Sequence, residues 1–165
     1  MRSLKPIPFT NDRYLHAMRD HIVVFDGAMG TNIQNLEPTA ADYGGETLWG
    51  NNDYLVISRP AMIETIHADF LRAGAEVIET CTFRSNRLTM REYGLQDRIL
   101  EMNRAAANLA RRTADRFAQA TGAPRFVAGS LGPTGFLPSA SDPALSNITF
   151  DELAAVLAEQ AQGLV

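Results

Sequence analysis

The sequence predicts an α/β protein with a parallel sheet, and three observations support this fold class. Short apolar segments alternate with longer segments of helical spacing, in the order strand, helix, strand, helix, strand, helix. Each strand-like segment runs into small or polar residues, at 26–28, 79–81 and 129–132. Strands that alternate with helices pair in parallel through right-handed crossovers. The chain has 165 residues, which is enough for one domain with a sizeable core.

The first third of the chain is expected to hold one helix, one strand and a long connection. Residues 11–20 have helical spacing, with Asn11 or Asp12 as the cap. The segment "HIVVFD" is β-branched and ends at a glycine, so we expect a buried strand over 22–26. Residues 27–58 look irregular, and a connection of this length is usually functional or disordered. Their apolar residues argue against disorder, so we expect an ordered excursion packed over one end of the sheet.

The middle of the chain is expected to form a helix, a strand, a short helix and a long helix. Ser58 is a candidate cap for a helix that has Pro60 in its first turn. A second strand is expected over 76–80, and a short helix over 85–93. A long helix is expected over 96–119, because apolar residues recur there every three or four positions.

The last third of the chain is expected to add one strand and one helix. Glycine and proline at 122–124 end the long helix, and "RFVAGSLGPTG" predicts a third strand over 126–130. Thr149 and Glu152 have the spacing of a capping box at the start of a final helix. Gly163 is a candidate C-cap for that helix.

Composition excludes several classes of function. The formal net charge is −4, and the densest basic spot, Arg111-Arg112, lies in a helical pattern, so we expect no nucleic-acid partner. No apolar run approaches the ~18 residues that a membrane-spanning helix needs. The single cysteine rules out an intrachain disulfide and fits a reducing compartment, so we expect a cytoplasmic protein.

The stretch "VFDGAMGT" places an acid between an apolar strand and a turn of small residues. Asp26 is a candidate acceptor for a ligand ammonium group, and Gly27 and Ala28 leave backbone N–H groups open to a ligand carboxylate. Together they predict a strand end that holds a small amino acid. The alternative is that Asp26 only caps the following turn, since Asp-Gly is a common turn signal.

Glu79 and Thr80 close the second expected strand. Glu79 is a candidate to bind a cation or a basic residue, and the alternative is a buried salt bridge or a structural hydrogen bond. Thr82 and Asn86 are candidates to bind a ligand, and capping of the next helix explains them equally well.

Cys81 is the single cysteine, and it follows the second strand. A zinc site with three protein ligands needs two more groups. The three histidines, His16, His21 and His67, are not expected at the same strand end. A small buried residue is therefore the favoured interpretation of Cys81.

The third strand end, "GSLGPTG", has the glycine content of a phosphate-binding loop but lacks its lysine and its spacing. We expect a backbone-lined wall or a simple turn. Ser130 has no expected histidine or acid partner, so a nucleophilic triad has little support.

Three longer segments carry a family resemblance: "VFDGAMGTNIQ", "GNNDYLVISRPAMIETIHADFLRAGAEVIETCTFRSN" and "VAGSLGPTG". In order and spacing they resemble the N-terminal homocysteine-binding domain of cobalamin-dependent methionine synthase, within the homocysteine S-methyltransferase family. The resemblance covers about residues 10–165, and "GNNDYLVISRP" points to the cobalamin-dependent enzyme. It implies an N-terminal extension with a short helix over 1–20 and part of the homocysteine-binding domain over 21–165.

The resemblance also implies a fold. The chain is expected to be the N-terminal portion of a (β/α)8 TIM barrel with parallel strands, with about three βα units present. A barrel of this kind typically takes ~250 residues, so we expect the chain to be the first part of a longer protein.

The chemistry implied by the resemblance is methyl transfer. Homocysteine binds at the carboxyl ends of the strands, and a zinc ion holds its sulfur as a thiolate. The thiolate takes a methyl group from methylcobalamin, which 5-methyltetrahydrofolate regenerates. The motifs that match contribute the implied homocysteine-binding residues Asp26, Gly27, Ala28, Glu79, Thr80, Thr82, Gly132 and Pro133.

Two departures from the family pattern limit these expectations. Cys81 stands where the family usually has asparagine, and the family's three zinc cysteines are expected beyond Val165. We therefore expect no metal ligand in this chain, incomplete binding of zinc and methylcobalamin, and no activity by the chain alone. Expected partners are homocysteine, the rest of the barrel, the folate and cobalamin domains, and a second copy through an exposed edge.

Two other functions remain open from the sequence. One is a non-catalytic half-barrel that serves as a binding or interaction module. The other is a zinc-independent barrel enzyme that uses Asp26 and Glu79 as acid and base, which needs a substrate within hydrogen-bond reach of both.

Overall fold

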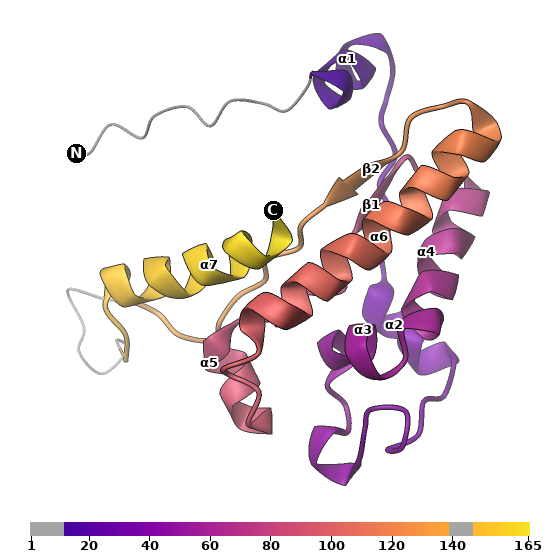
Figure 1. The fold of residues 1–165 in the computed structure, drawn as a ribbon. Helices are drawn as coiled ribbons and strands as arrows, with labels where there is room; N and C mark the ends of the chain where they lie inside the picture. Colours follow the sequence, from indigo (N-terminus) through magenta and orange to yellow (C-terminus); the bar gives the residue numbers. More distant parts are fainter. Residues whose placement is uncertain (1–11, 139–146) are drawn as a thin grey trace.

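The computed structural model describes residues 12–138 and 147–165 (Figure 1). The strands are β1 (Val77–Glu79) and β2 (Phe126–Ala128). The described part has short 3-10 turns η1 (Glu46–Leu48), η2 (Asn52–Tyr54) and η3 (Arg91–Tyr93). Its α-helices are α1 (Arg13–Asp20), α2 (Met29–Asn35), α3 (Leu55–Ser58), α4 (Pro60–Ala73), α5 (Arg87–Met90), α6 (Ile99–Thr121) and α7 (Phe150–Leu164).

The sheet is parallel, as the alternation of strands and helices predicts. Val77 of β1 lies opposite Phe126 of β2, and Glu79 lies opposite Ala128. On the other side of β1, Phe25 forms a parallel bridge with Val77. Three extended segments therefore run side by side and in one direction, which brings their carboxyl ends to the same edge.

The buried strand predicted over 22–26 is wrong in extent, because only Phe25 is bridged, and wrong in burial, because Ile22 and Phe25 are exposed. The N–H groups of Glu76 and Val77 both donate to Val24 O. The Asp26 N–H donates to Val77 O at 2.9 Å. The chain then turns into α2 directly after Gly27 and Ala28, so the ladder has no room to extend.

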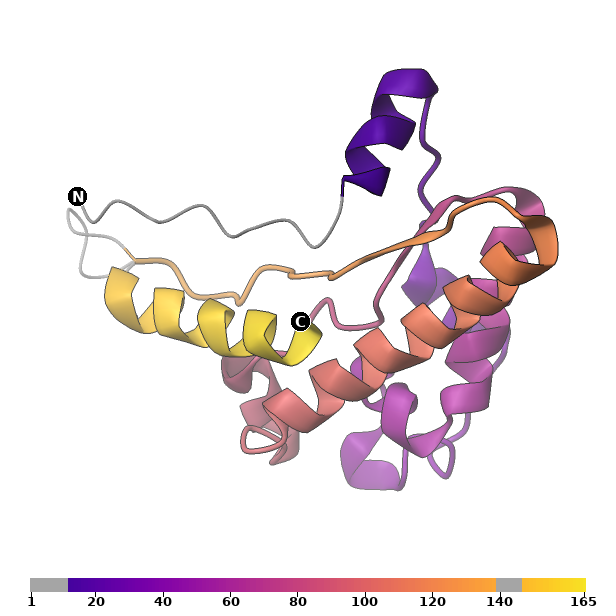
Figure 2. The same cartoon turned by 45° about the horizontal axis from the view of Figure 1, so that its top comes forward.

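Helices α4 and α6 cover one face of this sheet (Figures 1 and 2). Ile78 points from β1 into a buried cluster with Leu71 of α4 and with Ala110 and Ala114 of α6. Alanines at i and i+4 allow the long helix to approach the sheet closely. This packing fixes the direction of β1 and therefore the position of the residues that follow it.

The long helix and its end match the prediction closely. Helix α6 begins three residues later than expected, and it ends where Gly122 adopts a φ of +70°, a left-handed conformation that favours glycine. The start of α4 differs from the prediction. Arg59, not Ser58, occupies the N-cap, because Ser58 belongs to α3 and its hydroxyl donates to Tyr54 O at 3.3 Å.

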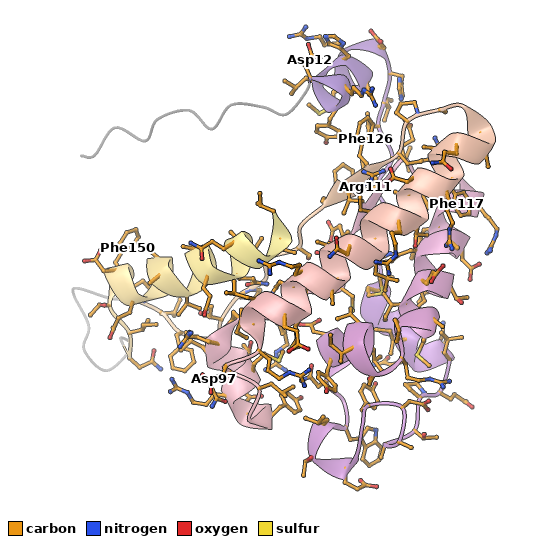
Figure 3. All side chains as sticks on the ribbon, viewed as in Figure 1. Asp12, Asp97, Arg111, Phe117, Phe126 and Phe150 are labelled. Carbon is orange, nitrogen blue, oxygen red and sulfur yellow. The ribbon has the colours of Figure 1, made fainter. Side chains whose placement is uncertain are left out.

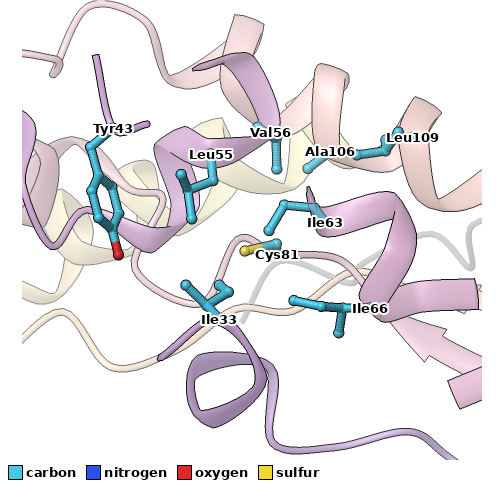
Figure 4. Close-up of a cluster of buried hydrophobic side chains, with 9 residues drawn as sticks. All are labelled: Ile33, Tyr43, Leu55, Val56, Ile63, Ile66, Cys81, Ala106 and Leu109. Carbon is cyan, nitrogen blue, oxygen red and sulfur yellow. The ribbon is translucent and has the colours of Figure 1, made fainter. Parts of the chain in front are cut away.

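Residues 27–58 are ordered, as expected, but they are more regular than predicted. They contain α2, η1, η2 and α3. Ile33, Leu55 and Val56 are buried in one cluster with two residues of α4 (Figure 4). The full cluster consists of Ile33, Tyr43, Leu55, Val56, Ile63, Ile66, Cys81, Ala106 and Leu109. The segment is held by burial of these apolar side chains against α4 and α6.

The short helix predicted over 85–93 is present as α5 followed by η3. Its cap is Asn86, whose Oδ1 accepts hydrogen bonds from the N–H groups of Leu88 and Thr89. Of the two roles considered for Asn86, the structure therefore shows helix capping.

Helix α7 begins with the predicted capping box. The Thr149 hydroxyl accepts from the Glu152 N–H, and the Glu152 carboxylate accepts from the Thr149 N–H at 2.9 Å. The helix lies against α6 (Figure 2). Gly163 is not a C-cap, which corrects the prediction. It is a buried helical residue, and a Cβ at this position would lie 2.6 Å from Asn103 Cβ of α6. The missing side chain allows the two helices to approach closely.

Helix α1 lies at the amino end of the sheet (Figure 3). The ring of Tyr14 meets that of Phe126 edge to face at 5.3 Å, and His21 contacts Glu76 at 2.7 Å. The helix predicted over 11–20 is confirmed from Arg13 onward, whereas Asn11 lies outside the described residues. Asp12 occupies the N-cap position without a capping hydrogen bond from its side chain.

Two further observations concern Arg111 of the basic spot and the length of the helices. Arg111 pairs with Asp115 at 2.8 Å and donates to Arg125 O at 2.9 Å, so this arginine ties α6 to the start of β2 (Figure 3). Among the described residues, no helix is both long and apolar enough to cross a membrane.

Candidate functional site

A cavity of about 390 Å³ opens at the carboxyl ends of the three extended segments. Its walls come from the first strand end, from the second strand end and from the segment around η2. The residues that line it are Asp26, Gly27, Ala28, Met29, Gly30, Gly50, Asn51, Asn52, Asp53, Glu79, Thr80, Cys81, Thr82, Phe83, Arg84, Met90, Tyr93 and Ser130. Of the sequence-predicted site residues, Asn86, Gly132 and Pro133 lie outside this lining, and the others are brought together in one pocket.

Asp26 and Glu79 bring two carboxylates to this pocket from neighbouring segments. Asp26 Oδ1 accepts a hydrogen bond of 3.0 Å from the Glu79 N–H, so its side chain spans the two strand ends. This bond shows that Asp26 does more than cap the turn that follows it. Burial, and secondarily the charge of Glu79, raises the pKa of Asp26 to about 6. A ligand cation at this position would relieve both effects.

Glu79 lies on the exposed side of the pocket rather than in a buried salt bridge. Its carboxylate accepts a hydrogen bond of 3.4 Å from the Ser130 hydroxyl. The buried salt bridge considered from the sequence is therefore wrong for Glu79. The other structural alternative, a hydrogen bond, is present in the contact with Ser130, which joins the second and third strand ends.

Gly27 and Ala28 form the turn between the first segment and α2. Ala28 has a φ of 46°, an uncommon left-handed conformation for a residue with a side chain. Its carbonyl accepts from the Asn32 side chain at 3.0 Å and from the Asn32 backbone N–H at 3.0 Å, and these bonds hold the strained turn in place. No neighbouring atom comes within 4 Å of a Cβ built on Gly27, so the space beside its backbone is open.

Thr80, Thr82 and Ser130 form a compact hydrogen-bonded wall, and both threonines are buried. The hydroxyls of Thr80 and Thr82 lie 2.7 Å apart. The Ser130 N–H donates to Thr80 Oγ1 at 2.9 Å, and Thr82 Oγ1 donates to Ser130 O at 2.8 Å. The wall ties the second strand end to the third. We refer to these three residues as the Thr80–Thr82–Ser130 wall.

Gly132 and Pro133 do not line the cavity. The Gly132 N–H donates to Phe83 O at 2.9 Å, and a side chain on Gly132 would collide with that carbonyl and with the Phe83 ring. Gly132 therefore affects the cavity indirectly, because it sets the position of Phe83, which lines the cavity. Pro133 is exposed.

Asn52 and Asp53 supply a wall of the pocket that was not predicted from the sequence. Asp53 is buried, and its Oδ2 accepts from the Arg84 N–H at 2.7 Å. Burial raises the pKa of Asp53 to about 6. Asn52 Oδ1 accepts from the Tyr43 hydroxyl at 3.0 Å. The signal in the sequence was the polar run "NND" directly before an apolar run, within a segment that was interpreted as a connection and as a family motif but not as part of the site.

Cys81 is buried and forms part of the core cluster around Ile33 and Leu55 (Figure 4). Its thiol lies 3.5 Å from Asn52 O and 4.0 Å from Asp53 Oδ1. Burial, aided by the charge of Asp53, raises the pKa of the Cys81 thiol well above its usual value. A thiol in this state is a poor nucleophile and a poor metal ligand, and the packing interpretation is confirmed.

A zinc site does not follow from the described residues. Within 12–138 and 147–165, no three side chains of His, Cys, Asp or Glu are grouped so that they could hold a metal ion. His16 and His21 lie with α1 at the opposite end of the strands, and His67 is buried in α4.

Comparison with known proteins places this geometry in a family. The model of the homocysteine S-methyltransferase family matches residues 23–165. The fold resembles that of the homocysteine methyltransferase MmuM from Escherichia coli. Its metallated form is 22% identical with a TM-score of 0.71 over 93% of this chain and 52% of that chain. Its oxidized form is 24% identical with a TM-score of 0.71, and the match covers 91% of this chain and 52% of that chain.

The chain therefore spans about half the length of the solved structures that it matches, with 52% of each covered. The three parallel segments and their helices correspond to part of a TIM barrel, so the predicted fold class is confirmed. The match of the family model covers most of the chain, from just before the pocket's first strand end to the last residue. This chain belongs to the homocysteine S-methyltransferase family.

Proposed function

We propose that this chain is the homocysteine-binding part of a cobalamin-dependent methionine synthase, with residues 21–165 in the binding domain and residues 1–20 as an extension. The observation that carries the proposal is the pair of carboxylates, Asp26 and Glu79, at the mouth of a 390 Å³ pocket in a chain of this family. The motif "GNNDYLVISRP" supports the cobalamin-dependent branch.

The proposed binding mode assigns each end of the amino acid to a different part of the pocket. The ammonium group lies between Asp26 and Glu79, where it offsets their mutual repulsion. The carboxylate meets the open backbone at Gly27 and Ala28. Thr80 and Thr82 form the wall behind the ligand, and Gly132 and Pro133 contribute through the loop that holds Phe83.

Zinc, methylcobalamin and folate are proposed to act with residues other than those described. No group of three metal-binding side chains occurs in the described residues, so we assign no zinc-dependent step to this chain. Its proposed role is to bind and orient homocysteine, and the chain alone is proposed not to make methionine. The rest of the barrel and the folate and cobalamin domains are the proposed partners. A cytoplasmic location stays a prediction.

A non-catalytic half-barrel module is the second candidate. The observation that favours it is the sheet itself, because among the described residues β2 pairs with β1 alone. An unpaired strand edge is a site for association with another chain. The zinc-independent acid–base hypothesis has less support, because no observed contact gives Asp26 and Glu79 the different roles of an acid and a base.

Calorimetric titration of the chain with L-homocysteine, with and without zinc, tests the proposal. We expect binding that does not depend on zinc. Asp26→Asn should weaken it by about tenfold, the amount expected for loss of one charge-assisted bond. Asp20→Asn, which changes an exposed acid of α1, is the matched control and should have no effect.

One further titration makes the result specific. 4-Mercaptobutyrate, which lacks the ammonium group, should bind far more weakly than homocysteine if Asp26 and Glu79 recognise that group. Absence of homocysteine binding by a folded chain would refute the proposed role. Formation of methionine by the chain alone would refute the assignment of zinc and cobalamin chemistry to other residues.

A further inference from the structure

Gln160 of α7 is a buried polar residue that reaches the candidate site from outside the strand ends. Its side chain is 0% exposed. Its Nε2 donates to Thr82 O at 2.7 Å and to Ser130 O at 3.4 Å. Neither the resemblance nor the pocket lining identifies this residue, because it lies behind the pocket wall rather than in it.

The two carbonyls that Gln160 contacts belong to the Thr80–Thr82–Ser130 wall. Within that wall, the Thr82 hydroxyl donates to Ser130 O, and the Ser130 N–H donates to the Thr80 hydroxyl. Gln160 adds a donor that bridges the second and third strand ends at the same point. The backbones of both strand ends are therefore held by one amide group.

The position of Gln160 is fixed by contacts on either side of it in α7. The preceding residue, Glu159, forms a two-point ion pair with Arg87 of α5, with distances of 2.6 and 2.5 Å. One turn later, Gly163 packs against Asn103 of α6. Asn103 Nδ2 in turn donates to Ser85 O at 2.8 Å, so α6 and α7 hold the same loop.

We propose that Gln160 is a positioning residue of the homocysteine pocket, which sets the spacing between its second and third strand ends. This inference rests on the proposed function. The bridge keeps the wall at the distance that fits the side chain of homocysteine. A shorter amino acid, such as cysteine, leaves a gap at the same wall and binds less well.

The first test is amide hydrogen exchange in Gln160→Met, which keeps the length of the side chain and removes the donor. The Ser130 N–H should exchange about tenfold faster or more, because local opening of the wall exposes it. The Met102 N–H, which donates to Arg98 O in α6, should be unchanged. Gln162→Met, at an exposed position of the same helix, is the matched control.

The second test is ligand discrimination, which a merely structural role would not change. The ratio of the Kd values for L-cysteine and L-homocysteine should fall in Gln160→Met, with homocysteine affinity lowered about tenfold. Gln160→Leu, which also lacks the donor, should give the same result. It keeps the test decisive if one variant does not fold.

The outcomes separate this inference from the proposed function. If Ser130 exchange is unchanged, or if Met102 exchange accelerates equally, the positioning role is refuted. If the ratio of the two Kd values stays constant while the wall opens, the role in discrimination is refuted. If the unmodified chain binds no homocysteine, the proposed function and this inference about the homocysteine pocket both fail, and the exchange data still decide whether Gln160 holds the wall.

Discussion

At the scale of single residues, the acids of the pocket differ in what their carboxylates contact. One carboxylate oxygen of Asp26 accepts a hydrogen bond from the Glu79 N–H, and Asp26 lies beside the carboxylate of Glu79. The carboxylate of Asp53 accepts a hydrogen bond from the Arg84 N–H. Burial raises the pKa of both acids to about 6. Only Asp26 is placed to meet a ligand ammonium group together with Glu79.

Homocysteine affinity should therefore increase with pH. With a pKa of about 6, Asp26 is about one tenth ionised at pH 5 and about nine tenths at pH 7, so affinity should rise roughly tenfold between them. Calorimetry at the two pH values measures this change. Asp26→Asn should abolish it and Asp53→Asn should retain it. A pH dependence that survives in Asp26→Asn would contradict the role of Asp26.

His67 of α4 is buried at 0% exposure, and both of its ring nitrogens lack a hydrogen-bond partner among the described residues. Burial lowers the pKa of His67 to about 4. The folded state disfavours the protonated ring. His67 therefore does not reduce the free energy of unfolding above its unfolded-state pKa of about 6.5, and it reduces that free energy progressively as the pH falls from 6.5 toward 4. The histidine is an internal source of acid sensitivity.

His67→Leu should remove that sensitivity. The variant should gain on the order of 2 kcal/mol relative to the unmodified chain when the pH is lowered from 7 to 5, because it has no ring to protonate. Urea unfolding of both proteins at both pH values measures this difference. Asp26 and Asp53 contribute with the opposite sign, but they are present in both proteins, so their contributions cancel in the comparison. His16→Gln, an exposed change in α1, is the control. An equal pH response in His67→Leu and the unmodified chain would exclude His67 as the cause.

At the scale of elements, α7 shows how a helix that supplies no pocket residue still shapes the site. Its amphipathic pattern and capping box are local properties, but its orientation depends on Gly163 and on the ion pair between Glu159 and Arg87. Loss of close approach at Gly163 would tilt the helix and move Gln160 away from the strand ends.

Gly163→Ala should therefore destabilise the protein despite the better helix propensity of alanine. The added Cβ would lie 2.6 Å from Asn103 Cβ, and overpacking of this kind costs about 1–3 kcal/mol. Thermal and urea unfolding measure the loss. Gln162→Ala, one residue earlier and exposed, should be neutral or slightly stabilising. A stabilised Gly163→Ala variant would show that α6 and α7 do not pack closely at this point.

At the scale of the whole molecule, the described chain is a sheet covered by helices on one face and open at one edge (Figures 1 and 2). Among the described residues, β2 pairs with β1 alone. Apolar side chains after β2 and at the start of α7 are exposed, including Leu131 at 44%, Leu137 at 64% and Phe150 at 73%. Figure 3 shows Phe150 at the end of α7 that lies away from the sheet. A chain with such an edge is prone to associate.

The 165-residue chain should self-associate as its concentration rises. Sedimentation velocity at about 5 and about 100 μM, a range that brackets a micromolar Kd, should show a growing share of dimers or larger species. Leu131→Lys with Leu137→Lys should shift this equilibrium toward the monomer, because charges block edge pairing. Trp49→Lys, an exposed apolar change near η1 and η2, is the control. A monomer at both concentrations would contradict the prediction.

The sequence by itself determined the order of the strands and of the helices after residue 58, but not α2 and α3, which lie in the segment expected to be irregular. Short β-branched runs, helical spacing, the glycine at 122 and the capping box at Thr149 are local signals, because each depends on contacts within a few residues. The same kind of signal placed Asp26, Glu79, Thr80 and Thr82 at strand ends, and parallel pairing then required those ends to share one edge.

Only the tertiary structure decided which of these residues meet in the pocket and what completes it. Asp53 lines the pocket although it lies 26 residues before Glu79 in the sequence. Gln160 contacts the pocket wall although it lies 78 residues after Thr82. Periodicity in the sequence carries no information over such separations. Gly132 lies outside the cavity and Gly163 lies inside a helix because packing against Phe83 and Asn103 sets their roles. Contacts between distant segments arise from the closure of the whole core, which no local pattern in the sequence specifies.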